Sequence, residues 1–175
     1  MPERYATRHD APLLGDVDLD EILADVPASY TVKGMFFARY VAALGDEWRD
    51  VAQALEAAPA AGRYHAFEPY PMRDYLRVFD RVARARFPGS TREAHRLLAR
   101  GEIEVFADST LGKVTLSLLH DPGATLLRYP DVFAVLTRGP EVSAIRRGSR
   151  LVAVVFPRFV GSRDHVVAQL EGLVL

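Results

Sequence analysis

The sequence contains no cysteine. This absence excludes disulfides, thiolate nucleophiles, cysteine-ligated zinc and iron–sulfur clusters. The sequence also has no apolar run close to the roughly 20 residues that a membrane-spanning helix needs. Its first residues lack the basic and then apolar pattern of a secretory signal. We therefore expect a cytoplasmic protein that has no membrane partner.

A strong excess of one charge is missing as well. Lysine and arginine total 22, aspartate and glutamate total 23, and the net charge is −1. Such a chain has no overall field to attract nucleic acid, so a nucleic-acid partner is not expected. Its 175 residues, 49% of them hydrophobic, suit one globular domain. We predict a loosely ordered acidic arm over residues 1–17 and a single α+β domain over residues 18–175.

Catalytic and metal-binding motifs are also lacking. No nucleophile elbow, phosphate-binding loop or dinucleotide fingerprint occurs, and no two of the five histidines have the spacing of a helical metal site. The sequence therefore predicts no catalytic residue, no metal site and no enzyme. An enzyme with dispersed catalytic residues, around His95, His120 and Asp108, remains an alternative.

Hydrophobic periodicity predicts helices over most of the chain up to Gly139-Pro140. The best-defined helix starts at Tyr70-Pro71, and a later one covers residues 103–119. Two β-rich runs joined at Gly148-Ser149 then predict an antiparallel hairpin, and residues 163–175 predict a last helix. The predicted fold class is α+β, with an N-terminal helical part packed on a small antiparallel hairpin or sheet that a C-terminal helix follows.

Polar residues in front of apolar stripes predict where several helices begin. The expected N-caps are Asp18 or Asp20, Asp46, Ser90 and Asp121. Ser90 is followed three residues later by a glutamate, which is the pattern of a capping box. Pro130 lies within helical sequence and is expected to kink or restart the helix.

Eight arginines lie between positions 73 and 100, and four of them share one arc of the predicted helix. These four are Arg73, Arg77, Arg81 and Arg84. They predict one of three arrangements. In the first, the arc is a solvated face on which Asp74–Arg77 and Asp80–Arg84 form ion pairs. In the second, it is a surface that binds an anionic partner or a second copy of the chain. In the third, the acidic arm covers it.

Aromatic residues are concentrated in the same helices. The main interpretation is a hydrophobic core, and the alternative is an apolar cavity that would suit a hydrophobic ligand or a flat cofactor. The speculative pocket residues are Phe36, Phe37, Tyr40, Tyr75, Phe79 and Phe106.

Several segments together resemble a paralogous family, abundant in myxobacteria, that is known only as a domain of unknown function. The resemblance runs from about Tyr30 to Phe159. It includes YTVKGMFFARYVAALG with its Gly34 step, FEPYPMRDYLRVF with Tyr70-Pro71, and a late helix with Gly112-Lys113. That family has no assigned binding residues, so none is carried over.

The order of segments is also similar to the haem-nitric-oxide-binding and vinyl-reductase-type sensor superfamily. This resemblance implies a ligand enclosed between helices and sheet. Two departures matter. The sequence lacks the Tyr-x-Ser-x-Arg element that holds haem propionates, so haem is not expected and no cofactor is predicted. After the final Gly-Leu-Val-Leu this layout would continue into another hairpin, so we expect a smaller sheet or a shortened version.

These observations predict a non-catalytic regulatory or sensor-like module that binds a small apolar ligand or a protein partner. The alternative is an interaction or oligomerisation module, including a homodimer, that uses the arginine-rich helices.

Overall fold

The structure is a computed structural model, and it describes residues 14–59, 62–117, 121–148, 151–157 and 161–174. The helices are α1 (Leu19–Asp25), α2 (Met35–Leu44), the 3-10 turn η1 (Gly45–Glu47), α3 (Trp48–Ala52), α4 (Met72–Arg86), α5 (Thr91–Asp108), α6 (Thr110–Ser117), α7 (Pro122–Leu136) and α8 (Arg163–Val174). The strands are β1 (Thr31–Lys33), β2 (Pro69–Pro71), β3 (Thr137–Arg138), β4 (Ser143–Arg147) and β5 (Leu151–Val155).

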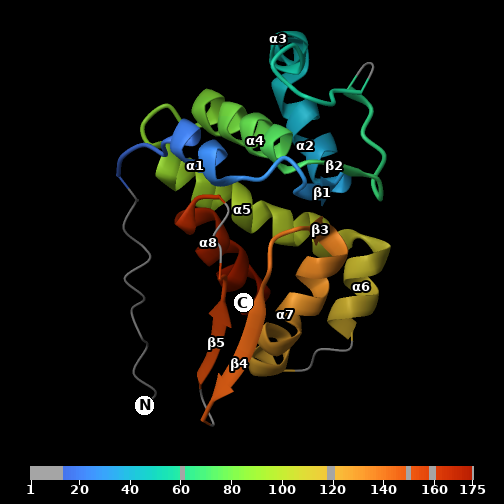
Figure 1. Cartoon of the computed structure of the whole chain (residues 1–175), viewed down its shortest axis with the longest axis vertical. Helices are drawn as coiled ribbons and strands as arrows, with labels where there is room; N and C mark the ends of the chain where they lie inside the picture. Colours follow the sequence, from blue (N-terminus) through green and yellow to red (C-terminus); the bar gives the residue numbers. More distant parts are fainter. Residues whose placement is uncertain (1–13, 60–61, 118–120, 149–150, 158–160, 175) are drawn as a thin grey trace.

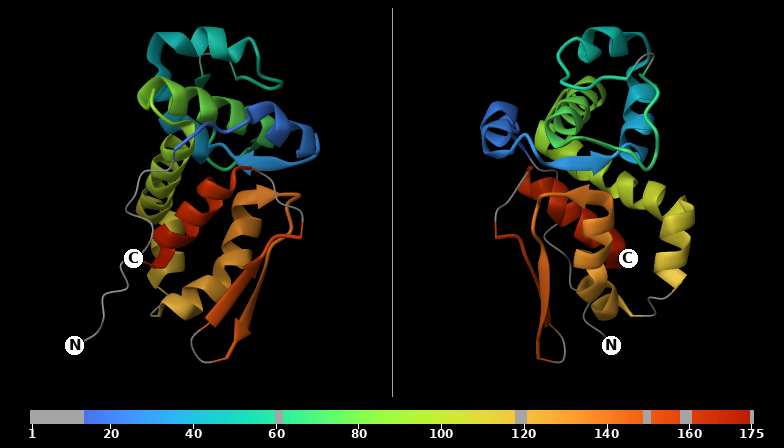
Figure 2. Two further views of the ribbon diagram at one scale, coloured as in Figure 1. Left: turned by 90° about the vertical axis from the view of Figure 1, so that its left-hand side faces the viewer. Right: turned by 45° about the vertical axis from the view of Figure 1, so that its right-hand side comes forward.

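The predicted α+β class is confirmed. Helix α5 crosses the middle of the molecule, with α1 to α4 on one side and α6, α7, the β4–β5 hairpin and α8 on the other (Figure 1). It packs against α4, α6 and α8, while the hairpin packs against α7 (Figure 2). One long helix therefore contributes to both halves of the fold.

The structure contains a three-stranded antiparallel sheet that the hydrophobic periodicity of the sequence did not predict. Strand β1 lies in its centre, pairing Val32 with Tyr70 of β2 and with Thr137 of β3. The sequence had predicted a helix that starts at Tyr70-Pro71 and helical structure up to Gly139-Pro140. Strands of two or three residues carry too little alternation to be recognised, because only pairing with distant segments defines them.

Three of the expected N-caps are confirmed. Asp18 accepts a hydrogen bond from the Glu21 backbone N–H at 3.0 Å, and Ser90 Oγ accepts one from the backbone of its capping-box glutamate at 3.3 Å. Asp121 accepts from the first turn of α7. Asp46 is not a cap, because it lies inside η1 and α3 has no side-chain cap.

One helix boundary differs from the prediction, and the restart that was one of two outcomes expected at Pro130 does not occur. The expected helix over residues 103–119 is the end of α5 followed by α6, with the break at Ser109. Ser109 Oγ donates to the Phe106 carbonyl at 2.6 Å and accepts from the Gly112 N–H at 2.9 Å, so this side chain ends one helix and caps the next. Pro130 lies inside α7, which continues through it.

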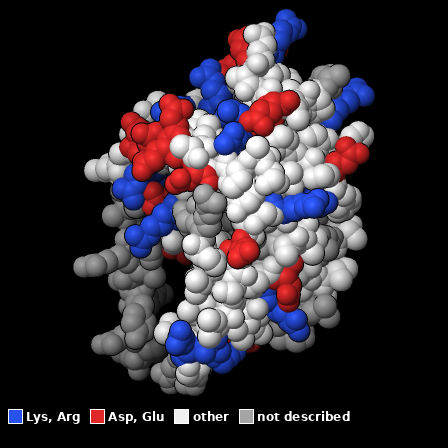
Figure 3. All heavy atoms as spheres, viewed as in Figure 1, with Lys and Arg blue, Asp and Glu red and all other residues white. Residues whose placement is uncertain are grey.

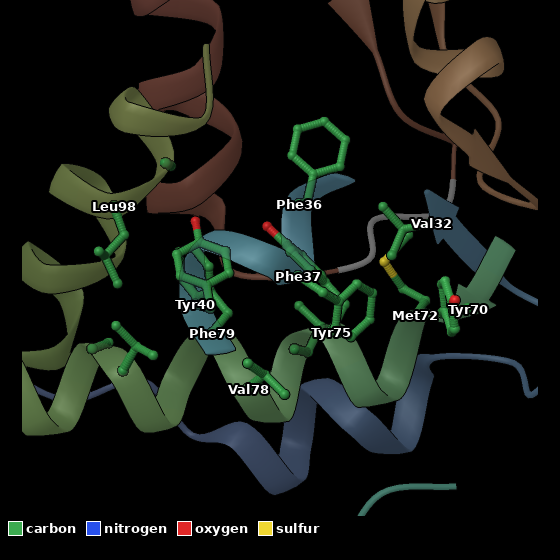
Figure 4. Packing of buried hydrophobic residues seen from close by; sticks show 14 of the residues in the cluster. Val32, Phe36, Phe37, Tyr40, Tyr70, Met72, Tyr75, Val78, Phe79 and Leu98 are labelled. Carbon is green, nitrogen blue, oxygen red and sulfur yellow. The ribbon is translucent and has the colours of Figure 1, made fainter. Parts of the chain in front are cut away.

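The hydrophobic core centres on α2 and α4 (Figure 4). Phe37 and Phe79 are fully buried and Tyr40 is 1% exposed. Phe37 stacks on Tyr64 with ring centroids 4.1 Å apart, and Tyr40 meets Phe79 edge-on at 5.3 Å. Such aromatic pairs add about 0.5–1.5 kcal/mol each beyond the burial of their area.

The segment before α1 runs along the start of α5. The Val17 N–H donates to Thr91 Oγ1 at 2.6 Å, and Ser90 Oγ donates to the Gly15 carbonyl at 2.8 Å. Val17 is buried. The part of the predicted arm that the structure describes is therefore tied to α5, and residues 1–13 lie outside the described residues, where a loosely ordered arm stays a prediction.

Candidate functional site

An apolar cavity of about 90 Å³ lies where the two halves of the molecule meet. Helices α2, α4 and α5 supply one wall, and α7 and α8 supply the other, with single residues from β1, β3 and the loops that flank the hairpin. Its main apolar lining is Val32, Phe36, Met72, Leu76, Ile103, Phe106, Val132, Phe133, Leu136 and Phe156. An apolar enclosure with a few polar groups is the usual character of a small-molecule site.

Only part of the predicted pocket lines this cavity. Phe36, Tyr75 and Phe106 lie on its wall, and the Phe36 ring points away from α4 (Figure 4). The other three predicted residues lie in the solid core beside it, and these are Phe37, Tyr40 and Phe79. The structure thus brings half of the predicted set to the cavity.

The sequence reasoning missed the wall that α7 supplies. Tyr129, Val132, Phe133 and Leu136 all face the cavity. Their spacing of three, four and seven residues is the stripe of an amphipathic helix, so the signal was present in the sequence. It was obscured by Pro130, which suggested a broken helix.

A buried carboxylate forms the polar end of the cavity. Glu102 of α5 is 2% exposed. Its Oε1 accepts hydrogen bonds from the hydroxyls of Tyr40, at 2.6 Å, and Tyr75. Its Oε2 accepts from Gln169 Nε2 at 2.7 Å and lies 3.1 Å from Nε2 of His165. Residues of α2, α4, α5 and α8 therefore meet at one side chain.

Electrostatics keep this carboxylate ionised. Burial acts to raise the pKa of Glu102, but the nearby His165 and the hydrogen bonds from the two tyrosines outweigh it, and the pKa is lowered. Burial raises the pKa of Tyr40 and of Tyr75 well above the ordinary tyrosine value, and the carboxylate raises both further. The tyrosines thus remain neutral donors to an anionic acceptor.

A second buried network lies next to the first. His95 Nε2 lies 3.3 Å from Asp80 Oδ1, and His95 Nδ1 lies 3.1 Å from Ser162 Oγ. Ser162 Oγ also accepts from the His165 backbone N–H at 3.2 Å. Burial lowers the pKa of His95, although Asp80 acts against it. The neutral imidazole links α4 and α5 to the start of α8.

The enzyme alternative does not gain a catalytic cluster from this network. His95 and Asp108 lie near opposite ends of α5, about 20 Å apart along the helix, which is far beyond hydrogen-bond reach. His120 lies outside the described residues. Within the described ranges, no group of three or more histidine, aspartate or glutamate side chains is arranged to hold a metal ion.

The four arginines of α4 all have internal acceptors. Arg73 donates to the Val26 carbonyl at 2.8 Å, and Arg81 pairs with Glu47 at 2.7 Å. The predicted ion pairs are present: Arg77 lies 3.3 Å from Asp74, and Arg84 lies 2.6 Å from Asp80. On the face shown in Figure 3, several acidic side chains gather at the upper left, with basic side chains close to them. Partner binding by these arginines stays a prediction, and it would compete with these contacts.

The arrangement defines a class of fold. The fold is similar to that of an H-NOX protein from K. algicida, a mutant whose crystal structure is of the Fe(II), unliganded form. That structure and this chain share 15% sequence identity with a TM-score of 0.55, over 81% of this chain and 78% of the other. A likeness at this identity shows the fold alone, and it agrees with the resemblance expected from the sequence.

The chain belongs to the family described as "Protein of unknown function (DUF2378)", which matches residues 26–175. The expected membership of a family of unknown function is confirmed. No curated protein matches the chain. Among the helices that the structure describes, none is long and apolar enough to cross a membrane.

The sensor superfamily that the sequence resembles has haem-binding members, and the residues that line this cavity do not fit a haem. The cavity of about 90 Å³ is far smaller than the roughly 300–1,000 Å³ of sites for drug-sized ligands. The imidazole at its wall, His165, directs Nε2 at Glu102. Of the described residues that line the cavity, none is a lysine or arginine that could pair with a propionate.

Proposed function

We propose that this protein is a non-catalytic, sensor-like regulatory module that binds a small apolar ligand in the cavity between α4–α5 and α7–α8. The observation that carries the proposal is the cavity itself, because it is apolar and is lined from both halves of the fold. The H-NOX-like fold supports a ligand-binding role for such a cavity.

The cavity is partly open and its walls are mainly apolar. Water inside it therefore faces few hydrogen-bond partners, and an apolar ligand that displaces this water removes apolar surface from contact with it. An apolar ligand would restore the missing van der Waals contacts, and this gain would contribute to its affinity.

The position of the cavity supports a regulatory role. A ligand there would contact Phe36 and Tyr75 from one half and Phe133 and Val166 from the other. Binding would therefore favour one relative position of α7 and α8 against α4 and α5. A ligand shifts such an equilibrium only as far as its affinity differs between the two positions, and a cavity lined by both halves would provide that difference.

Native mass spectrometry of the protein purified from the cells that naturally produce it tests the proposal. Val132→Phe places a ring in the cavity, whereas Val135→Phe places the same ring on the exposed face of α7, where Val135 is 51% exposed. We expect a non-covalent mass on the wild type and on Val135→Phe, lost after denaturation and missing from Val132→Phe. A bare wild-type chain, or a ligand retained by Val132→Phe, would contradict the proposal.

A further inference from the structure

The polar residues of the cavity wall are engaged with one another. Six polar side chains line the cavity among the residues that the structure describes, namely Tyr75, Glu102, Tyr129, Thr137, His165 and Gln169. Each takes part in a hydrogen bond or ion pair within the protein. This condition constrains the chemistry of any ligand, because a polar ligand group gains only from partners that are available to it.

Glu102 has its acceptor sites filled. A carboxylate offers about four lone-pair positions. Oε1 receives the Tyr40 and Tyr75 hydroxyls, while Oε2 receives the Gln169 amide and faces His165 Nε2 at 3.1 Å. An ammonium group in the cavity would have to displace one of these donors. A carboxylate in the cavity would lie near a buried anion and would have to take a donor away from it.

The remaining hydroxyls are committed too. The Tyr129 hydroxyl donates to Gln169 Oε1 at 3.4 Å, and Thr137 Oγ1 donates to the Phe133 carbonyl at 2.8 Å. The rest of the wall consists mainly of apolar side chains. A charged ligand group would therefore be buried without its own partner, which is among the most costly events in a protein interior.

We propose that the cavity selects uncharged, apolar molecules and rejects carboxylates and ammonium ions of the same shape, with Glu102 as the residue that sets the preference against carboxylates. The inference rests on the proposed ligand-binding function. The volume sets the size class: since a cavity of about 150 Å³ holds benzene, about 90 Å³ suits a short branched hydrocarbon chain.

Two pairs of isosteric probes test the selectivity by saturation-transfer NMR on the full chain. Isopentane is compared with isobutylammonium, and 2,3-dimethylbutane with isobutyrate. We expect each hydrocarbon to bind at least about tenfold more tightly than its charged counterpart, because the charge must be desolvated without a partner. Val132→Phe should abolish the hydrocarbon signal, and Val135→Phe should retain it.

The outcomes separate the two proposals. Equal binding of charged and uncharged probes, blocked by Val132→Phe, would overturn the selectivity and leave the ligand-binding function standing. Failure of all four probes to bind the wild type, together with a bare chain in the native mass spectrum, would overturn the function itself.

Glu102→Gln tests the role of the carboxylate. The amide removes the buried negative charge and brings two N–H donors. We expect the disadvantage of isobutyrate relative to 2,3-dimethylbutane to shrink at least about threefold, since one source of repulsion is gone. Glu104→Gln, at an exposed position of the same helix, should leave the ratio unchanged. If the folded Glu102→Gln protein binds 2,3-dimethylbutane and isobutyrate with the same affinity ratio as the wild type, Glu102 does not set the preference against carboxylates. If this variant does not fold, the probe pairs on the wild type still test the selectivity.

Discussion

At the scale of single residues, the most informative side chains are the ionisable ones that the fold buries. Glu102, Asp80 and His95 are each at most 3% exposed, and each is hydrogen-bonded. Buried charges are tolerated only when partners replace the lost water. Glu102 lies in the cavity wall, and the contacts of His95 with Asp80 and Ser162 tie α4 and α5 to the segment that leads into α8. The polar networks therefore help to hold in place the helices that form the cavity.

His95 should make the stability of the protein depend on pH. Burial lowers its pKa below the ordinary 6.5, against the effect of Asp80, while Arg84 and His165 also disfavour the charged form. A group whose pKa is depressed in the folded state contributes stability above its unfolded pKa, and that contribution is lost as pH falls through the folded value. We expect the free energy of unfolding in urea to decrease as pH drops below about 6.5.

The matched variants for this measurement are His95→Gln and His65→Gln. Replacing His95 should flatten the dependence below pH 6.5, whereas replacing His65, which is exposed, should leave its slope as in the wild type. An identical slope in His95→Gln and the wild type would assign the dependence to other groups.

At the scale of elements, close approach of segments explains two glycines that the family resemblance singled out. A Cβ at Gly34, just before α2, would overlap the His65 carbonyl and the Tyr70 ring. A Cβ at Gly112 in α6 would overlap the Phe106 carbonyl at the end of α5. Both glycines allow backbones to meet where a larger residue would force them apart.

Gly112→Ala should destabilise the protein although alanine is the better helix former. The propensity gain is about 1 kcal/mol, but the added methyl must displace the end of α5, and overpacking of this kind costs typically about 1–3 kcal/mol. We expect a lower urea midpoint. Gly89→Ala is the control, because its Cβ would meet no atom within 4 Å. A Gly112→Ala protein as stable as the Gly89→Ala protein would show that the α5–α6 corner is not tightly constrained.

At the scale of the whole molecule, two features join the N-terminal and C-terminal halves. Helix α5 packs against α4 and α8, and strand β1 pairs with β3, which follows α7. The ion pair between Arg92 and Asp164, at 2.7 Å, adds a further link between α5 and α8. These contacts predict that neither half is stable alone.

We therefore expect a single cooperative unfolding transition. Trp48, the only tryptophan, lies in α3 with its ring 5.9 Å from that of Tyr64, so its fluorescence reports on the N-terminal half. Far-UV circular dichroism reports on all the helices. The two urea transitions should coincide, as they do for two-state domains. A tryptophan transition that clearly precedes the loss of ellipticity would show that the N-terminal half unfolds separately.

Much of the fold was predictable because its signals are local. Caps at Asp18, Ser90 and Asp121 depend on a side chain reaching its own next turn, so the sequence alone indicates them. The β4–β5 hairpin was also predicted, because its two strands are adjacent in the chain. The break at Ser109 was missed, because one serine can either continue a helix or cap a new one.

The sequence by itself determined the composition of the core, the α+β class and the positions of most helices, since these follow from periodicity and capping within short segments. Only the tertiary structure decided which aromatic residues face a cavity and which fill the core. Phe36 and Phe37 are neighbours in sequence, yet Phe36 lines the cavity and Phe37 stacks on Tyr64. The tertiary structure likewise placed Glu102 among hydrogen-bond donors from three other helices, α2, α4 and α8. Packing between segments that are far apart in the sequence sets the distances between these helices and α5, and no local sequence pattern indicates it.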